Sequence, residues 1–427
     1  MTQALRLGIA GLGTVGAGVV RLVQAHGDLL AARTGRRVEI AAVCARERRD
    51  RGVDLSAYAW EDDPVALARR DDVDLLVELI GGADGPARAA TEAALDAGRH
   101  VVTANKAMLA IHGQDLALRA EAAGVALRFE AAVAGGIPCV KALLEGMAGN
   151  AVTRVSGVMN GTCNYILTRM EAAGLPYADV FEEARALGYL EADPNLDVGG
   201  IDAGHKLAIL AAIAFGTQVD FAGVALQGIE RVSIDDIRRA RDMGYRIKLL
   251  GEARRTEAGV EQSMRPTLVP EGSPLGQLEG GTNMVVIEGD AAGQIVLRGA
   301  GAGAGPTASA VVADVCDVAR GLVLPPFGQP AGTLAAPRRA EAATRCAHYL
   351  RMTLRDEPGA LAQVATALGR AGISIDRMRQ YDHPGDDAPV LIVTHPCPPA
   401  DLDAALRAAV ATGVLRGEPV ALQIQMP

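Results

Sequence analysis

The first 130 residues alternate short apolar runs with longer Ala-rich amphipathic segments. The apolar runs predict strands at 5–10, 38–43, 73–80, 100–103 and 125–130, and the segments between them, such as 85–97 and 113–123, predict helices. Strands that are apolar on both faces and alternate with helices are typical of a parallel sheet covered on both sides. We therefore expect an α/β fold with a doubly wound parallel sheet over residues 1–130.

The pattern changes between residues 131 and 323. Strand-like runs and helical stretches occur there in mixed order, which predicts an α+β domain: strands at 152–159, 284–288 and 294–298, and helices at 178–187, 201–215 and 234–243. The glycine-rich run 298–305 has the composition of a flexible linker. However, a strand precedes it, and Pro306 after it suits the first turn of a helix. This favours an ordered strand, glycine loop and helix, with helix 306–320 returning to the N-terminal domain.

A proline-rich segment, 324–347, separates the C-terminal part of the chain. Four prolines fall within it, at Pro325, Pro326, Pro330 and Pro337, so we expect a linker. The pattern that follows predicts a strand at 348–354, a helix at 360–371, strands at 373–381 and 389–395, a helix at 400–412 and a strand at 419–425. This βαββαβ order is typical of a ferredoxin-like domain over residues 348–427.

Composition narrows the class of protein. The 427 residues are 49% hydrophobic and 22% charged, which is ordinary for a globular protein of two or three domains. The net charge of −9 and the absence of a basic stripe argue against nucleic acid as a partner. Six scattered cysteines without a C-x-x-C pair indicate reduced thiols, and no apolar run approaches the ~20 residues of a membrane span. We expect a cytoplasmic protein.

The first motif with chemical meaning is Gly11-Leu12-Gly13-Thr14-Val15-Gly16. It follows an apolar strand and opens a helix, which is the context that a dinucleotide-binding G-x-G-x-x-G requires. The first glycine makes the tight turn, the second admits a pyrophosphate, and the third lets helix and strand pack closely. The alternative is a glycine-rich turn without a ligand. The motif predicts a Rossmann-type domain that binds a nicotinamide dinucleotide.

The end of the second strand bears on which dinucleotide is bound. NAD-binding domains place a carboxylate there to bind the ribose 2′-hydroxyl, whereas this chain continues Cys44-Ala45-Arg46. Because Arg46 could pair with a 2′-phosphate, we expect NADP(H) to be preferred, with NAD(H) as the second possibility. The alternative is that Arg46 belongs to a solvated run with Arg48 and Arg49.

Two further segments carry candidate cofactor and substrate residues. Thr103, a candidate cofactor contact, and Lys106, which could face the cofactor or a substrate carboxylate, lie at the end of a strand, at the sheet edge where open α/β sheets bind ligands. For Lys106, an exposed lysine is an equally good interpretation. The segment 188–206 is an acidic loop that leads into an apolar helix, on which Asp202 and Lys206 are four residues apart and share a face. A lysine entering a buried helix beside carboxylates suits proton transfer to or from an alcohol. An ordinary acidic loop before a core helix is the alternative.

Together these segments resemble homoserine dehydrogenases. The resemblance extends in order over the whole chain, and the tail resembles an ACT domain, with Asp356-Glu357-Pro358-Gly359 between strand and helix. The matching segments are GLGTVG, TANK, EAAVAGGIP (130–138), GVMNGTCNYIL (157–167), ALGYLEADPNLDVGGIDAGHKLAIL (186–210) and GAGAGPTASAVVADV (301–315). One departure is Cys163, where the family more often has Thr or Ser.

The resemblance implies an NAD(P)-dependent enzyme that interconverts L-homoserine and L-aspartate 4-semialdehyde, and it implies roles for individual residues. Lys206 would be the general acid/base. The substrate would be bound by Glu191, Asp202, Asp197 and Lys106. Lys106 would also lie at the cofactor junction, where Gly188 and Gly303 approach the cofactor by their backbone. A monovalent cation, Na⁺, would lie beside Glu130 and the carbonyls of Val133, Gly135 and Ile137.

The resemblance also implies partners. The ACT-like tail would sense an amino acid, with L-threonine as the expected effector, and the backbone N–H groups of loop 356–359 would be a seat for its carboxylate. The middle domain and the tail would support a homodimer or homotetramer.

Two alternatives remain open at this point. One is an aspartate-semialdehyde dehydrogenase-like enzyme, which needs a nucleophilic cysteine, and Cys163 has no identifiable base partner. The other is a nucleotide- and amino-acid-binding regulator without catalysis, which the set Glu191, Asp202 and Lys206 argues against.

Overall fold

The computed structural model describes residues 3–190, 193–340, 344–381 and 385–425. Its N-terminal part is a six-stranded parallel sheet in the order β3-β2-β1-β4-β5-β6. The strands are β1 (Leu5–Ala10), β2 (Val38–Cys44), β3 (Ala59–Glu61), β4 (Leu75–Glu78), β5 (His100–Thr103) and β6 (Leu127–Arg128). The chain reverses direction across the sheet between β1 and β4. The crevice at such a switch point is where doubly wound sheets bind nucleotides.

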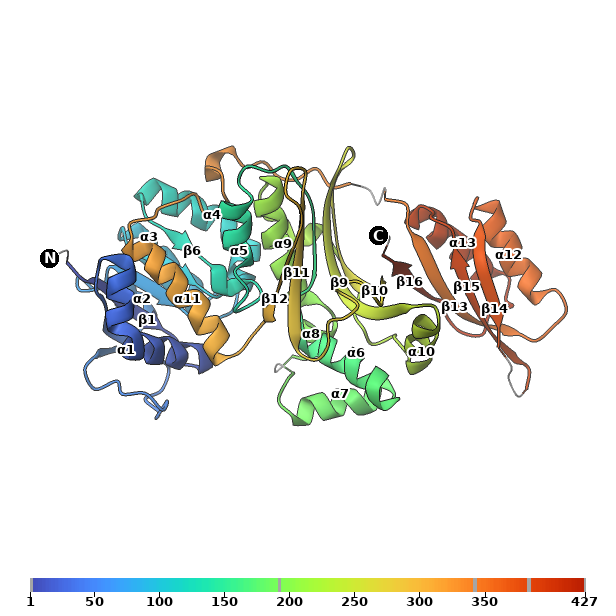
Figure 1. Ribbon diagram of the computed structural model, residues 1–427, viewed down its shortest axis with the longest axis horizontal. Helices are drawn as coiled ribbons and strands as arrows, with labels where there is room; N and C mark the ends of the chain where they lie inside the picture. Colours follow the sequence, from blue (N-terminus) through green and yellow to red (C-terminus); the bar gives the residue numbers. More distant parts are fainter. Residues whose placement is uncertain (1–2, 191–192, 341–343, 382–384, 426–427) are drawn as a thin grey trace.

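Helices cover both faces of this sheet. They are α1 (Thr14–Thr34), α2 (Pro64–Ala68), α3 (Pro86–Asp96) and α4 (Lys106–Ala123). A distant segment, α11 (Ala304–Ala319), lies beside α1 (Figure 1), although α1 ends at Thr34, 270 positions before α11 begins. Ala308, Val311 and Val315 of α11 are buried in the same core cluster as Val19 and Val20 of α1. The doubly wound fold class expected from the sequence is confirmed.

The middle part is built on a mostly antiparallel sheet, in which β8 pairs in parallel with the edge of β10. Its strands are β7 (Val152–Val158), β8 (Val224–Leu226), β9 (Tyr245–Thr256), β10 (Gly259–Pro270), β11 (Thr282–Gly289) and β12 (Gly293–Ala300). One face is covered by α9 (Ile201–Phe215), because Leu207, Ile209 and Leu210 are fully buried in the core that it shares with β9 and β10. The remaining helices are α5 (Cys139–Lys141), α6 (Gly161–Ala173), α7 (Tyr177–Ala186), α8 (Asn195–Val198) and α10 (Ile234–Asp242).

The C-terminal part has the βαββαβ order of a ferredoxin-like domain. Its elements are β13 (Ala347–Arg355), α12 (Ala360–Arg370), β14 (Ile375–Gln380), β15 (Asp387–Thr394), α13 (Pro399–Ala411) and β16 (Val420–Ile424). Its sheet is not separate, because β16 pairs in parallel with β10 at Thr267 and Leu268. The two parts therefore share one sheet across the right half of Figure 1.

A buried polar contact reinforces this junction. Asp236 of α10 is fully buried and accepts hydrogen bonds from Tyr349 Oη at 2.8 Å and Arg351 Nε at 2.7 Å, both on β13. Tyr349, Leu422 and Ile424 also belong to the core cluster of the middle part. Since removing the tail would expose Asp236 and the apolar core of the middle part that these tail residues cover, the tail is an integral part of the fold rather than an appended module.

Several sequence expectations need correction. The helix expected at 113–123 begins at Lys106, because the Asn105 side chain caps it by accepting from Met108 N at 3.1 Å. The proline-rich segment is not a free tether: Phe327 is buried against Phe129, and Ala331 N donates to the carboxylate of Glu121. Ala347 already belongs to β13. The strand β3 and the long β9–β10 hairpin were not predicted.

Candidate active site

A cavity of about 680 Å³ opens between the parallel sheet and the middle part. The N-terminal side contributes Val15, Ala104 and Lys106, and the middle part contributes Asn160, Gly188, Asp197, Asp202 and Lys206, with Gly303 and Thr307 closing the wall at the start of α11. Residues from five distant segments therefore meet at the crevice where a nucleotide is expected.

The centre of the cavity is one carboxylate between two lysines. Asp202 Oδ2 lies 2.7 Å from Lys206 Nζ, one helical turn along α9, and Asp202 Oδ1 lies 3.0 Å from Lys106 Nζ at the start of α4. Lys206 Nζ also donates to the carbonyl of Met159 at 2.8 Å. Burial alone would raise the pKa of Asp202, but the charges of Lys206 and Lys106 outweigh it and hold that pKa below its usual value. Asp202 therefore stays ionised and orients both ammonium groups.

A second carboxylate lies beside this set. Asp197 is 5% exposed and accepts a hydrogen bond from Asn160 Nδ2 at 3.0 Å. Asn160 also caps α6 by accepting from Cys163 N at 2.7 Å, so it ties the start of α6 to the loop that carries Asp197. Two lysine and two aspartate side chains therefore line the same part of the cavity. Glu191, the remaining expected substrate residue, lies outside the described residues.

Cys163 is unsuited to nucleophilic catalysis. It is fully buried, and its Sγ donates to the carbonyl of Asp197 at 3.2 Å. Burial and the neighbouring carboxylates raise the pKa of the thiol well above its ordinary value. A thiol in this setting does not form a thioester readily, which argues against the aspartate-semialdehyde dehydrogenase alternative.

The glycine loop has the shape of a phosphate cradle. A Cβ on Gly11 would approach Leu79 O to 2.5 Å and one on Gly16 would approach Gly11 O to 2.0 Å, so both positions require glycine for packing. A Cβ on Gly13 would meet no atom within 4 Å, which leaves the backbone open on the ligand side. Gly13 is the N-cap of the 21-residue helix α1, and no side chain caps the first N–H groups of this helix. Such N–H groups are suited to binding a phosphate.

The opposite wall also fits a dinucleotide. Asn283 is 1% exposed and lines the cavity, and its buried Oδ1 has no hydrogen-bond partner among the described residues. A buried acceptor of this kind needs a donor from a ligand or water. Gly188 and Gly303 adopt φ values of 73° and 118° and bring bare backbone to the cavity. These observations fit a nicotinamide nucleotide between the two walls.

Val15, Lys106, Gly188 and Gly303 line the cavity, whereas the expected cofactor residues Thr103 and Arg46 do not. The Thr103 side chain is fully buried and its hydroxyl donates to Glu78 Oε2 at 2.5 Å, so it supports the end of β5 rather than facing a ligand. Arg46 is exposed two residues after the end of β2, beside the strand β1 that leads into the glycine loop. This is the position from which a side chain could reach an adenosine ribose.

The expected cation residues form a tight turn after β6. Ala134 and Gly135 are consecutive residues with φ values of 55° and 51°, which turns the local carbonyls. The Glu130 carboxylate is 2% exposed and accepts hydrogen bonds from Val140 N and Lys141 N. Burial of Glu130, together with the negative charge of Asp314, raises the pKa of Glu130 to about 7. In the described part of the chain no three His, Cys, Asp or Glu side chains are grouped to hold a metal ion.

Several lining residues had not been assigned a role from the sequence. Asn160 lies within a segment quoted for the resemblance, but its link to Asp197 depends on the tertiary fold. Gly281 and Asn283 precede or begin an ordinary-looking strand and carry no local signal. The His205 ring packs against Phe221, with ring centroids 4.2 Å apart. Among the described helices none is both long and apolar enough to cross a membrane.

The fold and the cavity first indicate the class of protein, which is a nicotinamide-dependent dehydrogenase with a lysine–carboxylate site and a ferredoxin-like C-terminal part. Comparison with known proteins then identifies the family. Residues 11–130 match the description "Homoserine dehydrogenase, NAD binding domain", residues 138–316 match "Homoserine dehydrogenase", and residues 348–412 match "ACT domain". The chain belongs to the homoserine dehydrogenase family.

Individual relatives support this assignment. A homoserine dehydrogenase of Pseudomonas aeruginosa is 43% identical over 402 residues, which is 92% of each chain. A solved homoserine dehydrogenase of Thiobacillus denitrificans is 39% identical with a TM-score of 0.93, covering 99% of this chain and 98% of the other. A hyperthermophilic archaeal homoserine dehydrogenase in complex with NADPH is 25% identical with a TM-score of 0.65, covering 75% of this chain and 99% of its own.

Proposed function

We propose that this protein oxidises L-homoserine to L-aspartate 4-semialdehyde, and catalyses the reverse reduction, with a nicotinamide cofactor. The observation that carries the proposal is the set Lys206–Asp202–Lys106, held at 2.7 and 3.0 Å inside a cavity between the dinucleotide-binding sheet and the middle part. It combines a group able to move a proton with charges that match an amino-acid substrate.

Lys206 is the proposed proton-transfer group. A bound nicotinamide supplies the hydride acceptor or donor. In the reducing direction the Lys206 ammonium donates its proton to the forming alcohol; in the oxidising direction Lys206 first releases that proton to solvent, and the resulting amine takes the hydroxyl proton of homoserine. Asp202 and the Met159 carbonyl fix the position of Lys206 Nζ, so the proton moves at a defined atom.

The other charged side chains of the site are proposed to bind the carboxylate and ammonium groups of the substrate. Lys106, 31% exposed at its side chain and facing the cavity from α4, is placed to meet the substrate carboxylate. Asp197, held by Asn160, and Glu191 from the neighbouring loop are proposed to bind the ammonium group. Substrate would then bridge the two domains, which excludes water from the reacting atoms.

For the cofactor we propose NADP(H) rather than NAD(H). Residues Gly11, Leu12, Gly13, Thr14, Val15 and Gly16 would hold the pyrophosphate, with Gly188 and Gly303 against the nicotinamide side. Beyond the end of β2 the chain offers the exposed guanidinium of Arg46 and no carboxylate before Glu47. A guanidinium attracts a 2′-phosphate that a carboxylate would repel. NAD(H) would still bind through the shared pyrophosphate contacts.

A monovalent cation, Na⁺, is proposed beside Glu130 and the carbonyls of Val133, Gly135 and Ile137. A carboxylate that is 2% exposed is destabilised in its ionised form, and the rise of its pKa to about 7 reflects this cost. A cation at the turn would offset it. Because Gly135 packs against Gly301 in the cavity wall, an ordered turn would also fix that wall.

Regulation by an amino acid is proposed for the ACT tail, with L-threonine as the first candidate. The sequence indicates loop 356–359 as a seat for its carboxylate, and Gly359 begins α12 without a side-chain cap. A homodimer or homotetramer is also proposed, because the family resemblance implies that the middle domain and the tail support assembly.

A direct test mixes the full-length protein with L-homoserine and NADP⁺ and follows the absorbance of reduced cofactor. The proposal requires cofactor reduction that depends on homoserine and consumption of NADPH when aspartate 4-semialdehyde replaces it. A protein that binds cofactor but transfers no hydride in either direction would instead be a nucleotide-binding regulator.

A further inference from the structure

One buried amide in the wall of the active-site cavity lacks a hydrogen-bond partner. Asn283 is the second residue of β11, pairs with Gly299 of β12 and is 1% exposed. Its side chain lines the cavity, and its buried Oδ1 bonds no described residue. Other buried side-chain atoms in the described part of the chain also lack a partner, but none of the residues that carry them lines this cavity. A buried acceptor without a partner is costly unless a ligand or water supplies a donor.

The Asn283 amide is held in place by glycines on both sides. A Cβ on Gly301 would overlap with the amide, and a Cβ on Gly161 would lie 3.5 Å from Asn283 Oδ1. The amide is therefore inserted between the loop that precedes α11 and the start of α6. That loop is itself fixed, because the carbonyl of Ala300 accepts a hydrogen bond from Gly136 N at 3.0 Å. Asn283 Oδ1 therefore cannot turn to another partner unless ordered segments of the wall move.

The surroundings of Asn283 indicate which kind of donor its amide needs. The residues that flank the amide, Gly161 and Gly301, are uncharged. An ammonium group would be bound more strongly by the carboxylates of Asp197 and Asp202 in the same cavity than by an amide oxygen. The phosphate groups of a dinucleotide offer no donor. The nicotinamide carboxamide carries a neutral donor and an acceptor in one group, which the carboxamide of an asparagine complements.

We propose that Asn283 Oδ1 accepts a hydrogen bond from the carboxamide N–H of the bound nicotinamide and thereby fixes the orientation of the ring. This role rests on the proposed function, because it requires a nicotinamide cofactor in this cavity. A ring held only through its ribose can rotate about the bond to the sugar. A hydrogen bond from its carboxamide to a rigid residue selects one orientation, and so determines which face of the ring meets the substrate.

Calorimetric titration of the full-length protein tests this contact without turnover. The probes are NADP⁺ and its 3-acetylpyridine analogue, in which a methyl group replaces the carboxamide NH₂ and all other groups are the same. The unchanged protein should bind NADP⁺ at least about fivefold more tightly than the analogue, since only NADP⁺ can donate a carboxamide hydrogen bond to Asn283 Oδ1. If a ribose hydroxyl or a water is the donor instead, the two affinities will be equal, and that result would overturn the proposal.

Variants at Asn283 assign the preference to this residue. Asn283→Leu keeps the approximate shape of the side chain without its polar atoms, so this variant should bind NADP⁺ and the analogue equally. Asn283→Ala repeats the test with a smaller side chain in case the leucine variant does not fold. Asn283→Asp keeps an acceptor oxygen and should keep the preference, even where its charge weakens the binding of both probes. A purely structural role would change both affinities in proportion, so an unaltered ratio in Asn283→Leu would overturn the proposal.

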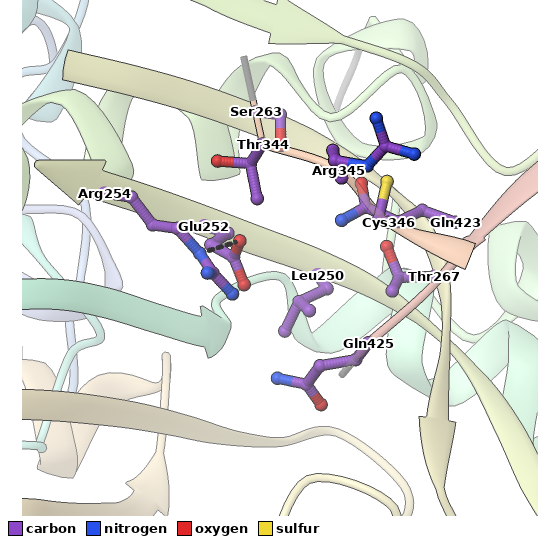
Figure 2. A pocket seen from close by; sticks show the side chains of 10 residues that line it. All are labelled: Leu250, Glu252, Arg254, Ser263, Thr267, Thr344, Arg345, Cys346, Gln423 and Gln425. Carbon is purple, nitrogen blue, oxygen red and sulfur yellow. Dashed lines mark hydrogen bonds and ion pairs between the residues drawn. The ribbon is translucent and has the colours of Figure 1, made fainter. Parts of the chain in front are cut away.

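A matched control comes from a separate hollow between β9, β10 and β16. Figure 2 shows the amides of Gln423 and Gln425 there, together with Arg254, which bonds Glu252 at 2.6 Å. Among the described residues, this hollow and the active-site cavity have no lining residue in common. Gln425→Ala therefore removes an amide away from the cofactor and should keep the preference for NADP⁺. Loss of the preference in Gln425→Ala as well as in Asn283→Leu would overturn the proposal, because the effect would not be specific to Asn283.

The titrations contain no homoserine, so they separate this role from the proposed activity. A protein that reduces NADP⁺ with homoserine but binds both probes equally would refute the role of Asn283 alone. A protein that shows the preference but transfers no hydride would support the role of Asn283 and refute only the proposed activity.

Discussion

The two members of the buried pair Asp202–Lys206 should differ strongly in how much stability they contribute. Asp202→Asn removes the negative charge that lies 2.7 Å from Lys206 Nζ, and leaves Lys206, 9% exposed, with neutral acceptors such as the Met159 carbonyl but no paired carboxylate. Leaving one charge of a buried pair without compensation costs about 3–5 kcal/mol. Because asparagine keeps one acceptor oxygen, we expect the lower end, about 3 kcal/mol.

Lys206→Met should be milder. Asp202 keeps Lys106 at 3.0 Å and Asn160 Nδ2 at 3.4 Å, and methionine fills the space of the lysine stem. We expect a loss of about 1 kcal/mol, the usual net contribution of one hydrogen bond. The double variant should be more stable than Asp202→Asn alone, because removing Lys206 removes the uncompensated charge. The two substitutions are therefore strongly non-additive.

Scanning calorimetry of the three variants and the unchanged protein measures this order. A loss of about 3 kcal/mol in a domain of this size corresponds to a fall in Tm of about 6–12 °C, and about 1 kcal/mol to about 2–4 °C. Lys106→Met is a useful comparison: its side chain is 31% exposed, so solvent screens it and the Tm should change little. The reasoning fails if Lys206→Met lowers Tm more than Asp202→Asn, or if the two effects simply add.

Two other predictions concern the cofactor and the cation. Arg46→Asp should raise the KM for NADP⁺ at least tenfold while changing that for NAD⁺ little, measured by steady-state kinetics; equal responses would mean that Arg46 does not contact the 2′-phosphate. Replacing choline by Na⁺ should raise Tm more at pH 8 than at pH 5.5. Burial raises the pKa of Glu130 from an ordinary 4.5 to about 7, so ionisation of Glu130 destabilises the folded state as pH rises through this range. A cation bound beside the ionised carboxylate would offset that cost. Glu130→Gln should remove the pH dependence of the Na⁺ effect, and a Na⁺ effect that persists in this variant would place the cation elsewhere.

Local patterns were sufficient for the parts of the site that lie close together in the chain. The glycine motif after an apolar strand predicted the nucleotide-binding sheet, and the spacing of Asp202 and Lys206 predicted their contact on one helical face. Such features depend on helix or strand periodicity alone. The resemblance supplied the link from these residues to a reaction.

Features that depend on tertiary packing were not predictable in the same way. Lys106 lies 96 positions before Asp202, and only the docking of α4 against α9 brings them to 3.0 Å. The β9–β10 hairpin was missed because charged residues occupy both faces of β9 near the turn, as at Arg254 and Arg255, which hides the apolar alternation. The pairing of β16 with β10 has no sequence signal, since either strand alone would suit a sheet edge.

The central claim is that Lys206 transfers the proton, and the kcat of Lys206→Ala measured with homoserine and NADP⁺ at saturation tests it most directly. Loss of a general acid/base should lower kcat by about 10²–10⁴. The Kd for NADP⁺ should stay near that of the unchanged protein, because Lys206 contacts Asp202 and Met159 rather than the glycine loop. A kcat within a few-fold of the unchanged protein would contradict the account.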